Sequence, residues 1–380
     1  MKYIILRCED LAPAREGIPS LIGAAKTTQL AQLSQAGAAG RVYPPKPHRA
    51  LNRFQVHRGL FGLAPEDPEA GSARCYAASI HLTPKPDEVI WCCELLTQHD
   101  GRIMDPTAGN IPTEQSRQLI QMLNAQFGSE RRRWQLGEDS HHVFVVRDES
   151  LTPRGPMSMS PPELLVGRPW LRSLPKGPAR DILRELLDQI SALLEEHPVN
   201  RVRADLGENP ANLVWVWGPS PGAGGQTFRE RTGLSGLVVS SRFPMRGFAQ
   251  CLGLAWEAGP DAMKAESLRR LMKSCAGWIQ TYDLVYIHLP IAYADPVERL
   301  CAMERIDQLL LKPLSERLTH GSTPLRLLVT IDDRALAMPF VAFGTTLARQ
   351  PIACLTAESF AKSPLQMSEA SQLFRWFTKG

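Results

Sequence analysis

Residues capable of nucleophilic or acid–base chemistry lie near the N-terminus, where Cys8, Glu9 and Asp10 follow an apolar run over residues 3–6. Such a run predicts a buried strand, and α/β sheets bind their ligands in the crevice beyond the carboxyl ends of their strands. Cys8 could act there as a nucleophile with His57 as its base, if a third group oriented the imidazole. The sequence offers no evident third group, so we expect Cys8 to be a small buried residue instead.

Two further groups of residues resemble functional sites but have simpler explanations. His141 and His142 could be metal ligands, yet neighbouring residues on a strand point to opposite faces of a sheet. The segment 218–225 is rich in glycine like a phosphate-binding loop, but it lacks the Lys and Ser/Thr that end a P-loop. We therefore expect a strand and a loop at these places, without a metal or a nucleotide.

The charge balance gives no sign of a strongly charged partner. The 380 residues carry 43 Lys and Arg against 39 Asp and Glu, a net charge of +4. So small an excess gives no reason to expect a nucleic acid or an anionic membrane surface as a partner. The richest basic run, Arg131–Arg133, is predicted to be a solvated helix end or loop.

The apolar residues predict neither a membrane span nor a secretion signal. No run approaches the roughly 18–20 apolar residues that a membrane span requires. The eight cysteines have irregular spacing, and adjacent Cys92 and Cys93 would point to opposite faces of a strand. A reduced, cytoplasmic protein without disulfides is expected from this pattern.

Strand-like and helix-like segments alternate along the chain. Buried-strand patterns cover residues 3–6, 77–82, 89–96, 143–146, 213–216, 236–240, 282–288 and 325–331. Amphipathic helical patterns begin at residue 28 and cover 113–127, 181–196, 262–279 and 296–318. This alternation predicts an α/β protein with a mostly parallel, doubly wound sheet covered by helices on both faces.

A change of pattern near residue 70 predicts a second domain. Residues 70–147 combine strand patterns around one helix, and residues 148–169 are rich in Pro, Ser, Gly and Met, which is typical of a linker. We predict a discontinuous core domain, residues 1–69 and 160–380. A smaller α/β cap domain with its linker, residues 70–159, is then inserted into it.

Several short motifs follow one another in a fixed order. They are Lys2–Leu6, Ala24–Leu30, Phe61–Pro65, Cys93–Thr97, Gly101–Asp105, Ala108–Glu114, His141–Val143, Pro210–Pro219, Tyr282–His288 and Glu304–Asp307. Their sequences are similar to "AAKTPNM", "FGYDP", "AGRISTEE", "ANMIWPWGPG", "YDFVYVH" and "ERID" of cofactor-independent phosphoglycerate mutases of the archaeal type. Each motif is weak alone, but the ordered set covers nearly the whole chain.

This resemblance implies both a fold and a chemistry. The implied fold is an alkaline-phosphatase-like doubly wound α/β core with an inserted α/β cap. The implied chemistry is phosphoryl transfer through a Ser nucleophile seated on two divalent metals, such as manganese, magnesium or zinc. The metals would lower the pKa of the nucleophile and neutralise charge on the transferred oxygens. Such a pair of metals requires Asp and His ligands from several strand ends.

The N-terminal positions implied by the resemblance hold other residue types. Arg7 stands where the family has its first Asp ligand. Arg53 stands where the family has its Ser nucleophile, and His57 follows four residues later.

The C-terminal ligand positions are also depleted. The segment 289–296 is shorter than its counterpart and has no His, with Asp295 as a poor remnant of an Asp–His pair. Asp332 and Asp333 keep a carboxylate, but the last His is missing from 334–339. On the substrate side, the family's arginines are replaced by Cys92, Asn110 and His142. We therefore expect no bound metal or other cofactor.

The arginines at the former metal positions have three explanations. Their guanidinium groups could pair with Asp332 and Asp333 as a structural plug, because removing two cations leaves negative charge uncompensated. Arg7 and Arg53 could instead point to solvent, or they could keep a vestigial phosphate-binding role. We call residues 7, 53, 57, 332 and 333 the vestigial pocket.

Two functions remain open from the sequence. The first is a pseudoenzyme kept as a binding, regulatory or complex-forming protein, with a protein partner or a second copy of itself. The alternative is an active 2,3-bisphosphoglycerate-independent phosphoglycerate mutase, or a related metal-dependent phosphotransferase or phosphatase. Its site would be rebuilt around Cys8, Glu9, Asp10, His57 and Asp332–Asp333.

Overall fold

A computed structural model shows two compact units, which are described separately. Unit 1 comprises Met1–Asp67, Gln226–Met245 and Leu252–Gly380, and unit 2 comprises Pro68–Gly225 and Arg246–Cys251. The structure describes residues 1–10, 21–43, 53–64, 71–148, 151, 159–177, 179–221, 225–261, 264–291, 295–320, 323–332, 338–344 and 346–379.

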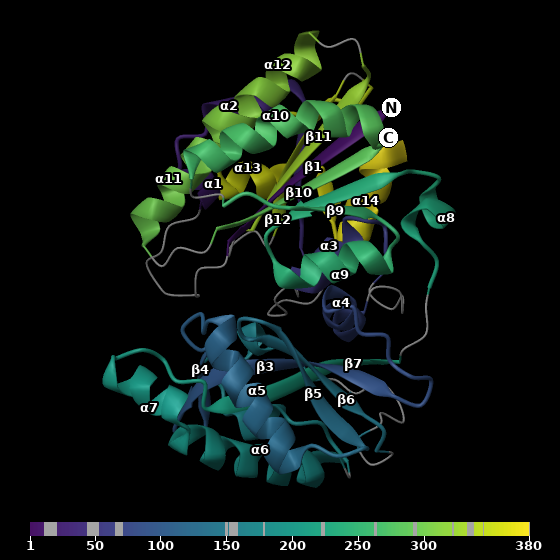
Figure 1. The fold of residues 1–380 in the computed structure, drawn as a ribbon. Helices are drawn as coiled ribbons and strands as arrows, with labels where there is room; N and C mark the ends of the chain where they lie inside the picture. The colour runs from purple at the N-terminus through teal and green to yellow at the C-terminus, as the bar shows by residue number, and fades with distance from the viewer. Residues whose placement is uncertain are drawn as a thin grey trace. The chain divides into compact units, whose positions relative to one another are not determined.

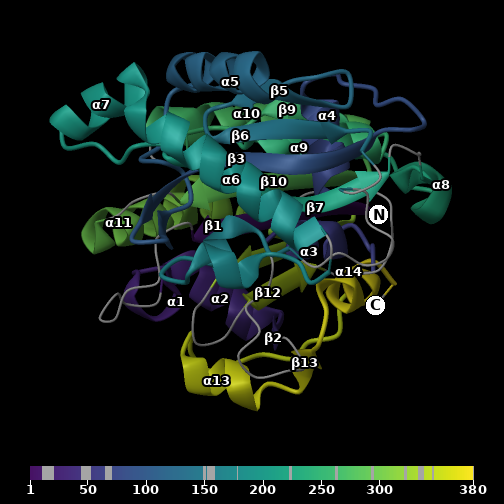
Figure 2. The ribbon, with the colours of Figure 1, turned by 90° about the horizontal axis from the view of Figure 1, so that it is seen from below.

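Unit 1 is built on an eight-stranded sheet with the order β13-β2-β12-β11-β1-β10-β8-β9. Its strands are β1 (Lys2–Asp10), β2 (Ala38–Val42), β8 (Gly236–Ser240), β9 (Ala255–Ala258), β10 (Leu284–Ile291), β11 (Leu325–Ile331), β12 (Met338–Gly344) and β13 (Leu365–Met367). The run from β11 through β1, β10 and β8 to β9 is parallel, and only β12 runs antiparallel to its neighbours. At the far edge β13 lies beside β2, which is distant in sequence (Figure 2).

Helices cover both faces of this sheet (Figure 1). The unit 1 helices are α1 (Leu21–Ala24), α2 (Thr28–Ala36), α3 (Arg53–Gly59), α8 (Phe228–Thr232), α10 (Ala265–Thr281), α11 (Pro296–Ile306), α12 (Lys312–His320), α13 (Ala357–Lys362) and α14 (Ala370–Lys379). A π-helical turn, Asp307–Leu311, joins α11 to α12. The predicted fold class, α/β with a doubly wound and mostly parallel sheet, is confirmed.

Alternate side chains of β1 point to opposite faces of the sheet. Ile4, Leu6 and Cys8 point to one face, where they join the apolar cluster that includes α10 and α12. Tyr3 points to the other face, and its ring meets Phe377 of α14 at a centroid distance of 5.7 Å. Arg7 shares the face of Tyr3 because it lies an even number of residues away. Arg7 and, by the same parity, Glu9 are therefore directed away from the apolar cluster.

Two of the family-like motifs meet at the start of α2. The Glu304 carboxylate accepts a hydrogen bond from the backbone N–H of Lys26 at 2.9 Å. The Asp307 carboxylate accepts from the N–H groups of Gln29 and Leu30 at 3.0 and 2.9 Å. The first N–H groups of a helix have no partner within it, and these carboxylates satisfy three backbone donors at the entry to α2. The Glu304–Asp307 motif thus has a structural role.

Unit 2 is built on a five-stranded antiparallel sheet. Its strands are β3 (Val89–His99), β4 (Arg102–Asp105), β5 (Arg132–Glu138), β6 (His141–Val146) and β7 (Leu213–Pro221). Strand β3 is central, because it pairs with β4, β6 and β7. The helices are α4 (Ser72–Ser79), α5 (Thr113–Phe127), α6 (Ala179–Glu196) and α7 (Pro198–Asp205), while α9 (Phe243–Cys251) is divided between the units.

The second unit extends further than the sequence predicted. We predicted that the cap ends at residue 159. Unit 2 instead runs to Gly225 and also includes Arg246–Cys251. The reason is strand pairing: β7 hydrogen-bonds to β3 from Val89 to Leu96, which ties 213–221 to the second sheet. A buried strand pattern does not say which sheet the strand will join.

Three local predictions were wrong. Residues 218–225 were predicted to be a loop, but β7 extends through Pro221. Residues 77–82 were predicted to be a strand, but α4 extends to Ser79 and a turn follows. Small residues such as Ala73 and Ala77 are buried in that helix, so its pattern lacks a clear helical period. The run Arg131–Arg133 was predicted to be a helix end or loop, but β5 begins at Arg132. Arg133 makes two hydrogen bonds to Glu88, at 2.7 and 3.1 Å.

Two further observations concern membrane-spanning helices and cysteines. No helix among the described residues is long and apolar enough to cross a membrane. All eight cysteines are free thiols, and Cys92 and Cys93 are both buried without a bond between them.

Candidate functional site

Arg7 lies buried at the carboxyl-terminal half of β1. Its side chain has no exposed surface, and its Nη2 lies 2.9 Å from Oδ1 of Asp332, which follows β11 directly. Nη1 also contacts the sulfur of Met338 at 3.3 Å. Burial lowers the pKa of Arg7, but the charge of Asp332, its hydrogen bond to Arg7 and the charge of Glu9 outweigh that effect, and the pKa is raised. The guanidinium is thus held as a buried cation.

This ion pair joins two of the five residues of the vestigial pocket. Arg7 pairs with Asp332, one of the two carboxylates that the plug hypothesis offered it. Asp333 lies outside the described residues, and of Arg53 the structure describes only its backbone at the start of α3. The observed geometry excludes the solvent-facing orientation for Arg7.

Next to this pair, Glu9, His57 and His288 form a buried cluster. Oε2 of Glu9 lies 2.7 Å from Nε2 of His288 and 3.7 Å from Nε2 of His57. The two imidazole rings meet edge to face with centroids 4.6 Å apart. None of the three side chains is more than 5% exposed. We call these three residues the Glu–His–His cluster.

Three elements bring the cluster together. Parallel pairing sets Arg7 of β1 opposite His288 of β10, so Glu9 and His288 lie on the same face of the sheet. Helix α3 crosses that face and supplies His57. The neighbouring Phe61 ring packs against Tyr286 at a centroid distance of 5.0 Å, which fixes the segment that follows the helix.

The remaining ring nitrogens of both histidines have hydroxyl partners. Nδ1 of His57 lies 2.6 Å from the hydroxyl of Tyr286. Nδ1 of His288 lies 2.9 Å from Oγ of Ser240, at the end of β8. Ser240 Oγ also accepts the backbone N–H of Arg242 at 3.1 Å. Both rings are therefore oriented with Nε2 directed at Glu9.

Burial and hydrogen bonding set the charges of the cluster. Burial lowers the pKa of His57 to about 3, although Glu9 opposes this shift. Burial also lowers the pKa of His288. Burial raises the pKa of Glu9, but hydrogen bonds and charge interactions with both histidines lower it well below its usual range. At neutral pH the cluster contains an ionised carboxylate and two neutral imidazoles.

The Cys8–His57 nucleophile considered from the sequence is not formed. Cys8 points to the opposite face of β1, among apolar residues, with no exposed surface. Burial raises the pKa of its thiol to about 12, so the thiolate is not populated at neutral pH. The expectation of a small buried residue agrees with this placement. The side chain of Asp10 lies outside the described residues.

Most of the cluster's partners were not predicted from the sequence. Glu9 and His57 were predicted for a rebuilt site, but His288 was recognised only as part of a motif, and Ser240 was not predicted to take part, nor was Tyr286. The available signal was the parity of strand positions. Whether Glu9 on the first strand and His288 on a parallel neighbour share a face depends on the register between the two strands, and the sequence does not give that register.

The residues described do not fit the two-metal site that the resemblance implies. Arg7, which the resemblance places at the first ligand position, is a guanidinium, and it engages the carboxylate of Asp332. Asp295, the other possible remnant, caps α11 by accepting the N–H of Val297 at 2.8 Å. A cation would meet a buried positive charge where the chemistry needs a ligand.

The three positions where the resemblance implies substrate-binding arginines lie in unit 2, and none of them holds an arginine. Cys92 is buried in β3, and burial raises the pKa of its thiol. Asn110 has a φ of 55°, a left-handed conformation in a tight turn, and its N–H donates to Thr107 Oγ1 at 3.2 Å. His142 is fully buried, and its Nδ1 accepts the N–H of Gly137 at 3.1 Å. The adjacent His141 is partly exposed, as the alternation of a strand requires.

A pH dependence follows from His142. Burial alone lowers its pKa to about 3 from 6.5. Between these two values the unfolded chain binds the proton and the folded chain does not, so the stability contributed by neutral His142 is lost as the pH falls. We expect His142→Gln, which keeps an acceptor, to reduce the slope of unfolding free energy against pH by up to about 1.4 kcal/mol per pH unit. Urea unfolding of both proteins across this window checks the difference, and parallel slopes would contradict it.

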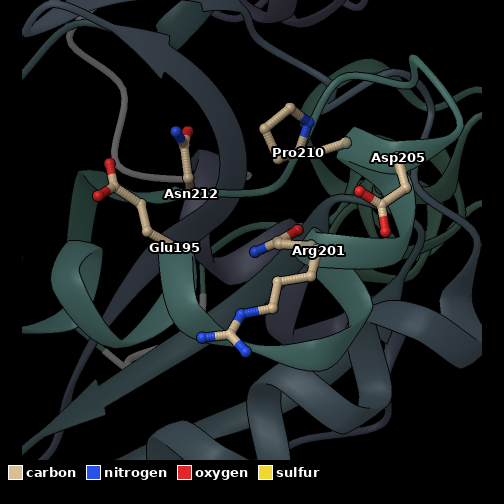
Figure 3. Close-up of a pocket in the computed structure, with 7 residues that line it drawn as sticks. Glu195, Arg201, Asp205, Pro210 and Asn212 are labelled. Atoms are coloured by element: carbon tan, nitrogen blue, oxygen red, sulfur yellow. The ribbon is translucent and has the colours of Figure 1, made fainter.

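Unit 2 also has a pocket of about 310 Å³ near the junction of α6 and α7 (Figure 3). Its lining includes Glu195, Arg201, Asp205, Pro210 and Asn212. The amide of Asn212 is occupied by hydrogen bonds with the backbone of β3. The lining contains no Cys, His, Ser or Thr.

The chain is similar to proteins described as phosphoglycerate mutases. A family model described as 2,3-bisphosphoglycerate-independent phosphoglycerate mutase matches residues 34–200. Proteins with that name are similar over most of the chain. The one from Methanosarcina barkeri is 26% identical over 87% of this chain and 85% of its own length. The one from Methanothrix thermoacetophila is 25% identical over 100% of both chains. A probable member from Geobacter sulfurreducens is 26% identical over 98% of both.

Solved structures share the fold. The cofactor-independent phosphoglycerate mutase from Thermoplasma acidophilum gives a TM-score of 0.58 at 19% identity, covering 100% of this chain and 99% of that one. A protein from Pyrococcus horikoshii gives 0.65 at 17% identity, covering 100% and 96%. These low identities establish the fold alone. The relatives found by sequence are similar along nearly the whole chain. The chain is therefore a phosphoglycerate-mutase-like protein, with the fold of the cofactor-independent phosphoglycerate mutases.

Proposed function

We propose that this phosphoglycerate-mutase-like protein does not catalyse phosphoryl transfer and works instead as a binding, regulatory or complex-forming protein. The observation that carries the proposal is the Arg7–Asp332 ion pair, with Arg7 fully buried at the position of the first metal ligand. A two-metal mechanism needs anionic ligands there to hold the cations that activate the nucleophile. A buried guanidinium supplies the opposite charge.

The proposal has further support from the neighbouring groups. Within the described residues, internal hydrogen bonds occupy the cluster beside Arg7: His288 donates to Glu9, and His57 and Tyr286 share a hydrogen bond. These groups have less than a tenth of their surface exposed. A protein partner or a second copy of the chain, in the cytoplasm, remains the proposed context of its function.

The test is a turnover assay on the full chain. Purified protein is incubated with manganese, magnesium or zinc, and interconversion of 3-phosphoglycerate and 2-phosphoglycerate is measured. Hydrolysis of a simple phosphate monoester is followed in parallel. The Methanosarcina barkeri relative serves as the positive control. We expect no turnover above the metal-only blank. Turnover that chelation abolishes and that copurifies with the chain would overturn the proposal.

A matched variant sharpens this assay. Arg7→Asp restores the carboxylate of the implied first ligand but leaves Arg53 at the nucleophile position. We expect it to remain inactive, since one ligand cannot replace the nucleophile and the missing histidines. Light scattering on the same preparations measures the oligomeric state, and calorimetry with 3-phosphoglycerate tests for a retained phosphate ligand.

The alternative function, an active phosphotransferase or hydrolase with a rebuilt site, has one observation in its favour. Glu9 and His57 converge, as such a site would require. Against it, Cys8 points away from His57, and the only hydroxyls in hydrogen-bond contact with the two histidines belong, among the described residues, to the fully buried Ser240 and Tyr286. The turnover assay decides between the two functions.

A further inference from the structure

We propose that Cys75 and Cys251 are a reversible oxidation site, at which a hydroperoxide joins the two thiols as a disulfide across the contact between α4 and α9. Both residues belong to unit 2, because Arg246–Cys251 of α9 is grouped with α4 in that unit. Neither cysteine forms a disulfide in the structure. The inference does not rest on the proposed function, since neither residue belongs to the vestigial pocket or to the Glu–His–His cluster.

Helices α4 and α9 approach each other closely at their backbones. A Cβ atom added to Gly247 of α9 would lie 1.8 Å from the carbonyl oxygen of Cys75 and 2.6 Å from the backbone N of Ser79. The Ser79 hydroxyl joins the two helices, because it donates to the carbonyl of Cys75 and accepts the N–H of Gly247, both at 2.9 Å. Cys75 therefore lies at the point of close approach.

Cys251 lies one helical turn after Gly247. Residues four apart share a face of a helix, and helical side chains lean toward its N-terminal end, so Cys251 is directed back over Gly247 and toward Cys75. The two thiols are in hydrogen-bond contact. A disulfide requires Cα atoms about 4.4–6.8 Å apart and side chains that point toward each other. Because Gly247 places no side chain between the helices, bond formation needs side-chain rotations and a small shift of α9, without unfolding.

The two cysteines differ in exposure, which assigns their roles. Cys75 is fully buried, whereas Cys251 is partly exposed. The hydrogen bond with Cys75 lowers the pKa of Cys251, and the charge of Arg74 lowers it further, while burial opposes both. Redox-sensitive thiols are accessible, have a lowered pKa and lie beside a second thiol. Cys251 is therefore the thiol that meets the oxidant, and Cys75 is the thiol that resolves the product.

The reaction balances with hydrogen peroxide or an organic hydroperoxide as the oxidant. The Cys251 sulfur attacks a peroxide oxygen, the O–O bond breaks, and a sulfenic acid forms on Cys251 while water or an alcohol leaves. The Cys75 sulfur then attacks the Cys251 sulfur, the S–O bond breaks, and a molecule of water leaves with the Cys75 proton. The two thiols lose two electrons and two protons, which reduce the peroxide. A dithiol reductant reverses the reaction by thiol–disulfide exchange.

Packing alone is the competing explanation for this pair. A cysteine is a small apolar residue that fills a tight contact between helices without reacting. Packing accounts for the buried Cys75, but it gives no reason for a partly exposed thiol directed at it. The two explanations predict different products of oxidation, so a search for the cross-linked peptide separates them.

The experiment treats the full, reduced chain with hydrogen peroxide, stops the reaction by alkylation and maps the peptides without reductant. Chymotrypsin is suitable, because it can cut after Leu82 and so separates Cys75 from Cys92 and Cys93. We expect a cross-linked peptide that contains Cys75 and Cys251, from protein that runs as a single chain on a non-reducing denaturing gel. Treatment with dithiothreitol should restore both thiols.

Variants assign the two roles. Cys251→Ser should lose the cross-linked peptide entirely and keep Cys75 reduced. Cys75→Ala should also lose it, but a sulfenic acid on Cys251 should persist and react with dimedone, because the resolving thiol is absent. Cys301→Ala is the matched control, since Cys301 is also partly exposed but lies on α11 of unit 1, and its cross-link should form as in the unaltered protein. If a variant fails to fold, the peptide map of the unaltered protein decides.

Folded protein that yields no peptide joining Cys75 to Cys251 after peroxide treatment overturns the proposal and leaves packing as the explanation. A disulfide that joins Cys251 to a different cysteine also overturns it, as does a cross-link that persists in Cys251→Ser. These outcomes are separable from the proposed function, because mutase turnover is measured with reduced protein.

Discussion

Replacing Arg7 with leucine should lower the free energy of unfolding of unit 1 by about 3 kcal/mol. Removing one partner of a buried ion pair costs about 3–5 kcal/mol, since the other charge stays buried without compensation. Arg7 is fully buried, but Asp332 is 22% exposed, so water can partly solvate the remaining carboxylate. The expected loss therefore lies at the low end of that range.

Urea unfolding followed by circular dichroism, with hydrogen exchange in β1 to assign the loss to unit 1, measures the effect. Arg201→Leu is the matched control, because the Arg201–Glu196 pair has exposed fractions of 63% and 72%. Exposed pairs contribute at most about 1 kcal/mol. The double variant Arg7→Leu with Asp332→Leu should recover part of the loss. Ordinary surface substitutions change the free energy of unfolding by less than about 0.5 kcal/mol. A change that small in Arg7→Leu would contradict a structural role for the pair.

Replacing Gly247 with alanine should destabilise unit 2 by about 3 kcal/mol, at the upper end for overpacking. A Cβ atom at this position would lie 1.8 Å from the carbonyl oxygen of Cys75 and 2.6 Å from the backbone N of Ser79, both in α4. These atoms belong to the backbone and cannot move aside as a flexible side chain would. The shift would also disturb the hydrogen bond from the Gly247 N–H to Ser79 Oγ, now 2.9 Å.

The control for this prediction is Gly277→Ala in α10. No heavy atom lies within 4 Å of a Cβ added there, so alanine should stabilise the helix by up to about 1 kcal/mol. Thermal and urea unfolding of the two variants beside the unaltered protein give opposite signs if close packing is the cause. Equal and small effects would show that α9 can move away from α4 without loss.

The buried polar residues of unit 1 compensate one another. Arg7, at the position where the resemblance implies a metal ligand, is paired with Asp332. A buried carboxylate without any cation would be costly, and this pairing avoids that cost. The Glu–His–His cluster lies beside this pair and is organised by different residues.

The sequence by itself determined the fold class and many elements. Long periodic segments were predicted closely: the helix at 113–127 and the strand at 236–240 have the predicted bounds in the structure. Apolar periodicity over many residues is a local property, so it can be recognised without knowing the partners. The sequence also predicts that Arg7 and Arg53 replace family residues, a prediction that needs only an ordered set of motifs.

Only the tertiary structure decided which polar residues meet. Glu9 and His288 are 279 residues apart, and their contact depends on the register between β1 and β10. A shift of one residue would turn one of them to the opposite face of the sheet. The same holds for β7, whose apolar pattern predicted a strand but not its pairing with β3 in the second unit. Register and sheet membership are set by packing between distant segments, and no local pattern in the chain encodes them.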